Sequence, residues 1–92
     1  MSTIVIPDHL VNKYSLPAEY QCQECTVGEA LAAFSNQYPK IIPFLYDDNG
    51  GIGRFINLFL DGEDIRNISG MESVLADSSE IVIILAVAGG LQ

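Results

Sequence analysis

The apolar positions of this chain fall into short runs that predict β-strands. Five segments have the length and the apolar or alternating pattern of strands: residues 4–6, 19–24, 54–60, 63–66 and 81–86. The first two are expected to pair as a hairpin across a long polar connection, and Asp61-Gly62 predicts a tight turn between the third and the fourth. The last segment is apolar at every position, so we expect it in the middle of the sheet, parallel to the first strand.

One segment has the pattern of a helix. Thr26 followed three residues later by Glu29 fits a capping box, which satisfies free backbone amides at a helix start. The apolar side chains that follow have one-face spacing: Val27, Ala30, Leu31 and Phe34. Pro39 ends the pattern, so the sequence predicts one main helix of about three turns, with a single further turn within residues 71–76. Together these elements predict an α+β fold: a mixed sheet of four to five strands with one main helix packed on one face.

Strand alternation predicts which side chains point away from that helix. One set in residues 54–60 is purely aliphatic and is expected to face the helix: Ile56, Leu58 and Leu60. The opposite face then receives four apolar side chains: Phe55, Phe59, Val82 and Ile84. Exposed aromatic residues on a small domain indicate a partner-binding patch, here with an acidic rim, although loops of the same chain could also cover it.

Length and composition place the chain among globular proteins. Its 92 residues, 49% of them hydrophobic, predict a single domain over residues 1–92 that needs neither a disulfide nor a metal to fold. Twelve acidic residues against four basic ones give a net charge of −8, which disfavours nucleic acid and membrane surfaces as partners. The charge favours proteins with a basic face, or serves solubility alone. The first residues lack the features of a signal peptide, so a cytoplasmic location is expected.

Two cysteines could carry chemistry of their own. Cys22 and Cys25 form a C-x-x-C pair just before the predicted helix, where they could act as a redox pair or as half of a metal site. Zinc would need two further ligands, and the chain has one histidine, so two ordinary thiols and no metal site are the favoured interpretation.

The chain ends in a diglycine directly after the last apolar strand. We expect residues 87–92 to form a flexible tail, because Gly89 and Gly90 lack a Cβ and can thread a narrow channel in a partner. In such a tail Val87 and Ala88 would set the register.

These features resemble the ubiquitin-like β-grasp sulfur carriers of the ThiS and MoaD family, and particularly those of the CysO type. The resemblance rests on five segments: Ile6-Pro7, Thr26-Val27-Gly28, Arg54-Phe55-Ile56-Asn57, Glu63-Asp64-Ile65-Arg66 and Ala86-Val87-Ala88-Gly89-Gly90. It implies a β-grasp carrier that is not an enzyme and binds no cofactor. A ubiquitin-activating-type adenylyltransferase would use ATP to adenylate Gly90, which becomes a thiocarboxylate and delivers sulfur to a synthase.

Two departures from the family pattern matter. Leu91 and Gln92 follow the diglycine, so the Gly90 carbonyl is part of an amide and cannot be adenylated. Removal of the dipeptide by a zinc metalloprotease that cuts between Gly90 and Leu91 is the favoured explanation; a remnant of expression or the loss of carrier function are the alternatives. Leu85-Ala86 stands where many relatives have proline.

The sequence leaves the destination of Gly90 open. Synthesis of cysteine, molybdopterin or thiamin could each receive the sulfur. A ubiquitin-like modifier that is conjugated to lysines would use the same glycine, and a non-carrier binding subunit of a synthase would not need it.

Overall fold

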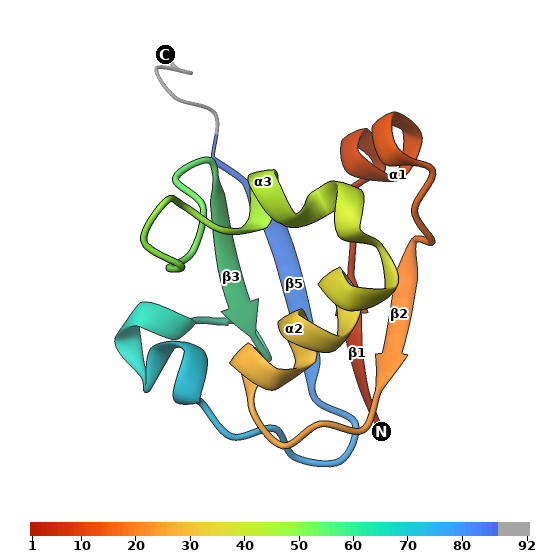
Figure 1. Ribbon diagram of the computed structural model, residues 1–92. Helices are drawn as coiled ribbons and strands as arrows, with labels where there is room; N and C mark the ends of the chain where they lie inside the picture. Colours follow the sequence, from red (N-terminus) through yellow and green to blue (C-terminus); the bar gives the residue numbers. More distant parts are fainter. Residues whose placement is uncertain (87–92) are drawn as a thin grey trace.

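The computed structural model describes residues 1–86, and its centre is a five-stranded mixed sheet with the strand order β2-β1-β5-β3-β4 (Figure 1). The strands are β1 (Ser2–Val5), β2 (Glu19–Cys22), β3 (Ile56–Leu60), β4 (Glu63–Asp64) and β5 (Glu80–Leu85). The last strand lies in the middle and is parallel to β1, as predicted. It is antiparallel to β3. β1 and β2 form the predicted antiparallel pair.

The predicted helix is α2 (Val27–Gln37), which crosses one face of the sheet (Figure 1). The Thr26 Oγ1 atom accepts a hydrogen bond of 3.2 Å from the Glu29 amide, which confirms one half of the capping box. The Glu29 carboxylate accepts its bond from the amide of Cys25, one residue before the cap, also at 3.2 Å. The two bonds together fix the point at which the chain enters the helix.

Further helical segments correct the prediction of a single helix. The connection between β1 and β2 contains α1 (Asp8–Tyr14), and α3 (Ile42–Leu45) follows a 3-10 turn at Pro39–Ile41. α1 begins after Pro7 and buries Leu10 completely, with Val11 and Tyr14 half-buried. Positions 10, 11 and 14 have the spacing of one helical face, but the segment is too short for this pattern to be recognised from the sequence.

Three strands are shorter than predicted: β2 ends at Cys22 rather than at residue 24, and β3 and β4 are shortened as follows. β3 begins at Ile56 rather than at residue 54, because the Ile56 amide closes a turn onto the Gly53 carbonyl. β4 ends at Asp64, whose carboxylate accepts a bond from the Arg66 amide and caps a 3-10 turn, Ile65–Asn67. The turn expected within residues 71–76 is a 3-10 turn at Gly70–Glu72.

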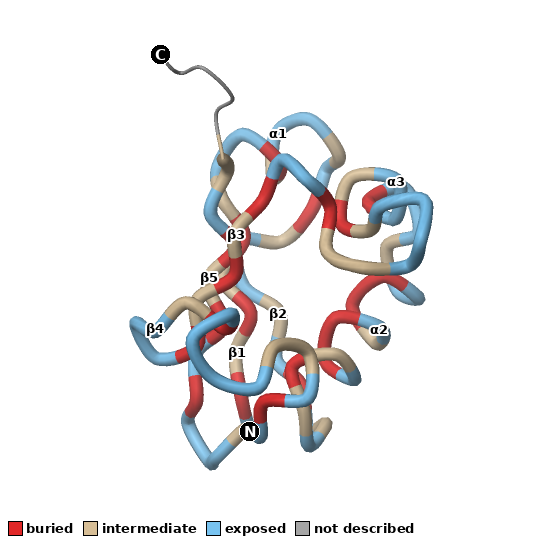
Figure 2. The backbone as a smooth tube through the Cα atoms, turned by 90° about the vertical axis from the view of Figure 1, so that its left-hand side faces the viewer, coloured by how far each residue is buried: buried red, intermediate tan, exposed pale blue. Residues whose placement is uncertain are grey.

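The core lies between α2 and the sheet. The four helix side chains with one-face spacing are all completely buried: Val27, Ala30, Leu31 and Phe34. Figure 2 shows buried stretches along the central strands and along α2. The rings of Phe34, Tyr20 and Tyr38 form a cluster in which Phe34 lies 5.2 Å from Tyr20 and 5.4 Å from Tyr38, centroid to centroid, and the two tyrosines lie 6.3 Å apart. This cluster joins α2 to the edge strand β2.

Gly53 is expected to be intolerant of any side chain. A Cβ on this buried residue would overlap the Phe44 carbonyl oxygen, and the Gly53 amide donates a 2.6 Å hydrogen bond to the Leu45 carbonyl. Gly53→Ala should therefore lower the free energy of unfolding by about 1–3 kcal/mol in chemical denaturation. Gly51→Ala is the matched control, because its Cβ would meet only the end of the Asp47 side chain. Equal stabilities of the two variants would contradict this packing.

Candidate functional site

The face of the sheet turned away from α2, called here the open face, carries the predicted patch. Ile56, Leu58 and Leu60 are buried on the α2 side of the sheet, at 4, 1 and 8% exposure, so the alternation predicted for β3 is confirmed. The four residues of the predicted patch belong to the open face. Phe55 is 50% exposed and Ile84 is 43% exposed, whereas Phe59 and Val82 are half-buried.

Strand register brings these side chains together. Phe59 is paired with Val82, and Asn57 is paired with Ile84 in the next row. One row further on, the Ala86 amide donates a 2.7 Å hydrogen bond to the Phe55 carbonyl. The four side chains Phe55, Phe59, Val82 and Ile84, called here the open-face patch, therefore form one continuous surface that leads to Ala86.

Val5 belongs beside this patch and was missed from the sequence. It is half-buried and is paired with Val82 across the parallel β1–β5 ladder. The alternation of β1 alone could have assigned its face, but the register to β5 is a long-range property that no local pattern indicates.

The predicted tail residues lie outside the described part of the chain. They are Val87, Ala88, Gly89, Gly90 and Leu91. Ala86, the last described residue, lies where β5 ends. Because β1 and β5 are parallel, this is also the end of the sheet from which β1 continues into α1 (Figure 1).

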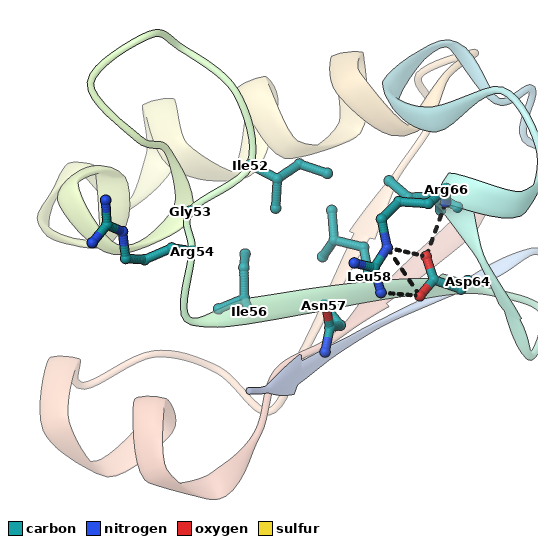
Figure 3. Close-up of a pocket in the computed structure, with 9 residues that line it drawn as sticks. Ile52, Gly53, Arg54, Ile56, Asn57, Leu58, Asp64 and Arg66 are labelled. Atoms are coloured by element: carbon teal, nitrogen blue, oxygen red, sulfur yellow. Dashed lines mark hydrogen bonds and ion pairs between the residues drawn. The ribbon is translucent and has the colours of Figure 1, made fainter. Parts of the chain in front are cut away.

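A small hollow lies at the edge of β3, on the side of the sheet toward which Ile56 and Leu58 point (Figure 3). Its volume is about 220 Å³, and it is lined by Ile52, Gly53, Arg54, Ile56, Asn57, Leu58, Asp64, Ile65 and Arg66. The Arg66 side chain donates three hydrogen bonds to the Asp64 carboxylate, the shortest of 2.6 Å, and this bonding lowers the pKa of Asp64. Ligand pockets are usually larger, roughly 300–1,000 Å³, so the hollow does not fit a nucleotide.

The cysteines occupy different environments. Cys22 is 4% exposed, its Sγ lies 3.6 Å from the Ser2 carbonyl oxygen, and burial raises the pKa of its thiol, with the nearby Glu24 charge adding to the effect. Cys25 is exposed. Residues 1–86 hold no group of three His, Cys, Asp or Glu side chains that could bind a metal ion. Within the same residues, no helix is long and apolar enough to cross a membrane.

Alkylation should separate the two thiols. Iodoacetamide at pH 8 is expected to modify Cys25 at least tenfold faster than Cys22, because the thiolate is the nucleophile and burial disfavours it. Peptide mass spectrometry of the folded and denatured protein measures both rates. The Cys25→Ser variant should stay nearly unmodified until it is denatured. Equal labelling of both cysteines in the folded protein would contradict the burial of Cys22.

Fold and open face together define the class of protein. A mixed sheet with a central last strand and one main helix across one face is the ubiquitin-like β-grasp. A chain in the crystal structure of the BexX/CysO complex from Amycolatopsis orientalis has this fold: the match has a TM-score of 0.84 at 28% identity, over 98% of this chain and 100% of that one.

The sequence comparisons give the family. The model of the ThiS family matches residues 14–90. The sulfur carrier protein CysO of Mycobacterium tuberculosis (strain H37Rv) is 33% identical over 67 residues, which cover 71% of this chain and 72% of that protein. A putative sulfur carrier protein of Archaeoglobus fulgidus is 28% identical over 72 residues, 78% of this chain and 82% of that protein. The chain therefore belongs to the ThiS family and is homologous to the CysO sulfur carriers.

Proposed function

We propose that this protein carries sulfur on the carbonyl of Gly90 after Leu91 and Gln92 have been removed. The observation that carries the proposal is the extent of the family match, which runs through the diglycine to residue 90 and stops before Leu91. The homology to named sulfur carriers supports the same role.

The proposed chemistry needs an activated carboxylate and no catalytic side chain of the carrier. A carboxylate oxygen of Gly90 attacks the α-phosphorus of ATP in the adenylyltransferase, and pyrophosphate leaves. Hydrosulfide then attacks the acyl carbon, AMP leaves, and the resulting thiocarboxylate donates its sulfur in a synthase. Residues 87–90 can span at most about 14 Å, so the partner must dock close to Ala86.

The dipeptide gives this chemistry a control step. While Gly90 is joined to Leu91 by a peptide bond, it has no carboxylate to adenylate. A zinc metalloprotease that hydrolyses this bond would create the reactive group, so processing would decide how much carrier is available. The carrier itself would bind neither the metal nor ATP.

The open-face patch is the proposed docking surface for the adenylyltransferase. In a chain that ends at Gly90, Ile84→Asp should weaken binding to that enzyme by about 1–3 kcal/mol, or roughly 5- to 150-fold in Kd, because it places a charge in an apolar contact. Ile42→Asp is the matched control, since Ile42 is 40% exposed on α3. Isothermal titration calorimetry measures both. Equal affinities of the two variants would contradict docking through the patch.

Reconstitution tests the proposed function. The full chain and a chain that ends at Gly90 are incubated with ATP and the ubiquitin-activating-type adenylyltransferase of the source organism, and pyrophosphate is measured. Release is expected with the shorter chain alone. No release with either chain would overturn the carrier proposal, and release with the full chain would overturn the processing step. Adducts on the lysines of other proteins, in place of a thiocarboxylate, would instead identify a protein modifier.

A further inference from the structure

We propose that the partner that activates this carrier has a basic ridge that contacts three acidic residues bordering the open-face patch. This inference rests on the proposed function and adds the chemistry of the partner. The three residues, called here the acidic border, are Glu19, Asp61 and Glu80.

Strand register places the acidic border on the open face. One row of paired residues crosses the whole sheet: Glu19, Val5, Val82, Phe59 and Asp64. In the next row, away from Ala86, Glu80 is paired with Thr3, and the Asp61 carboxylate accepts a 2.9 Å hydrogen bond from the Glu80 amide. In the direction of Ala86 the rows are formed by Asn57 with Ile84 and by Phe55 with Ala86. On the open face, the rows nearest Ala86 thus carry no acidic side chain, whereas Glu19 lies at the β2 end of the Phe59–Val82 row and Glu80 and Asp61 lie in the row beyond it.

The charges of this border are not balanced within the sheet. None of the strand residues is Lys, Arg or His. The ion pairs in residues 1–86 join the Met1 ammonium to Asp77 and Arg66 to Asp64, so Asp64, at the end of the row, already has its cation. Glu19 and Glu80 are exposed and take part in neither pair.

A basic protein surface fits this arrangement better than a second copy of the chain. Two open faces brought together would place unbalanced carboxylates of both copies in one interface, and each copy has a net charge of −8. A partner with apolar side chains beside its active-site channel and Lys or Arg side chains farther away would match both parts of the face. The positive charge of such a ridge would orient the carrier during association so that Ala86 lies at the entrance of the partner's active-site channel.

Charge reversal tests the proposal. Glu19→Lys and Glu80→Lys are made separately in the chain that ends at Gly90. The rate at which the adenylyltransferase releases pyrophosphate is measured with each variant at carrier concentrations well below half-saturation, where this rate reports on association of the two proteins. At 50 mM NaCl each variant should react at least about threefold more slowly than the parent chain, and the difference should shrink to less than twofold at 500 mM because salt screens exposed charges. Glu72→Lys has the same charge change on an exposed residue of the 3-10 turn that packs against α2, and should change the rate less than twofold.

The possible results separate this proposal from the function on which it rests. If the parent chain reacts and the two border variants behave as Glu72→Lys does, the basic ridge is wrong and the carrier function stands. A slower rate that salt does not restore would also overturn the ridge, because it would indicate damage to the fold or to close contacts; thermal melting of each variant identifies the former. If the parent chain does not react at all, both proposals fall. Sedimentation of the parent chain as a dimer that dissociates in Ile84→Asp would assign the face to a second copy and overturn the ridge.

Discussion

Gly90→Ala is expected to abolish sulfur loading while leaving the fold intact. In the proposed function the tail enters a narrow channel of the partner, where a methyl group on the acyl residue would add a Cβ and would restrict the backbone dihedrals that the partner can impose. In a chain that ends at residue 90, we expect the rate of thiocarboxylate formation to fall by at least about 100-fold, in line with the cost of misplacing a reacting group. Mass spectrometry of the reconstituted reaction measures the loss.

Gly51→Ala is the control for this variant as well. It makes the same chemical change in an exposed loop, and its Cβ would meet only the Asp47 carboxylate. It should be loaded at the parent rate. Loading of Gly90→Ala at the parent rate would contradict the requirement for glycine at the acyl position.

Phe34→Ala is expected to have the largest effect on stability. Phe34 is completely buried on α2 and packs against Tyr20 and Tyr38, so its removal loses apolar burial and leaves a cavity between the helix and β2. Such truncations cost about 3–5 kcal/mol, which is a large part of the roughly 5–15 kcal/mol that holds a small domain folded. Urea denaturation measures the change.

The position, rather than the residue type, should decide this cost. Phe55→Ala removes the same atoms from a side chain that is 50% exposed, and it should cost less than about 1 kcal/mol. Phe34→Leu keeps most of the volume and should cost about 1.5 kcal/mol or less, so it remains measurable if Phe34→Ala does not fold. Similar costs for Phe34→Ala and Phe55→Ala would contradict the packing of α2 on the sheet.

The main features of the fold could be predicted because their signals are local. Thr26 and Glu29 mark the start of α2, Pro39 follows its end, and the alternation in β3 separates buried from exposed side chains. The central position of β5 was predicted from its continuous apolar sequence, which is typical of a strand covered on both faces. In the structure one face is buried, and Ile84 on the other is 43% exposed.

What could not be predicted depends on context. α1 is two turns long, too short for periodicity to stand out, and it is stabilised by packing of Leu10 in the core. β4 ends early because the Asp64 carboxylate caps the following 3-10 turn, and the sequence of residues 63–66 does not show whether the strand or the turn forms there. The open-face patch was assigned from β3 and β5 alone, whereas Val5 and the acidic border enter through register between strands that are far apart in sequence.

The most direct test of the sulfur-carrier role is the intact mass of the untagged protein from its own host, measured with and without a reagent that alkylates thiocarboxylates. We expect a chain that ends at Gly90, is heavier by the exchange of one oxygen for sulfur, and gains the alkyl group. That mass would establish both the removal of Leu91-Gln92 and the loading of Gly90. A single mass that ends at Gln92 and does not react, even in cells that are starved of sulfur-containing products, would contradict both.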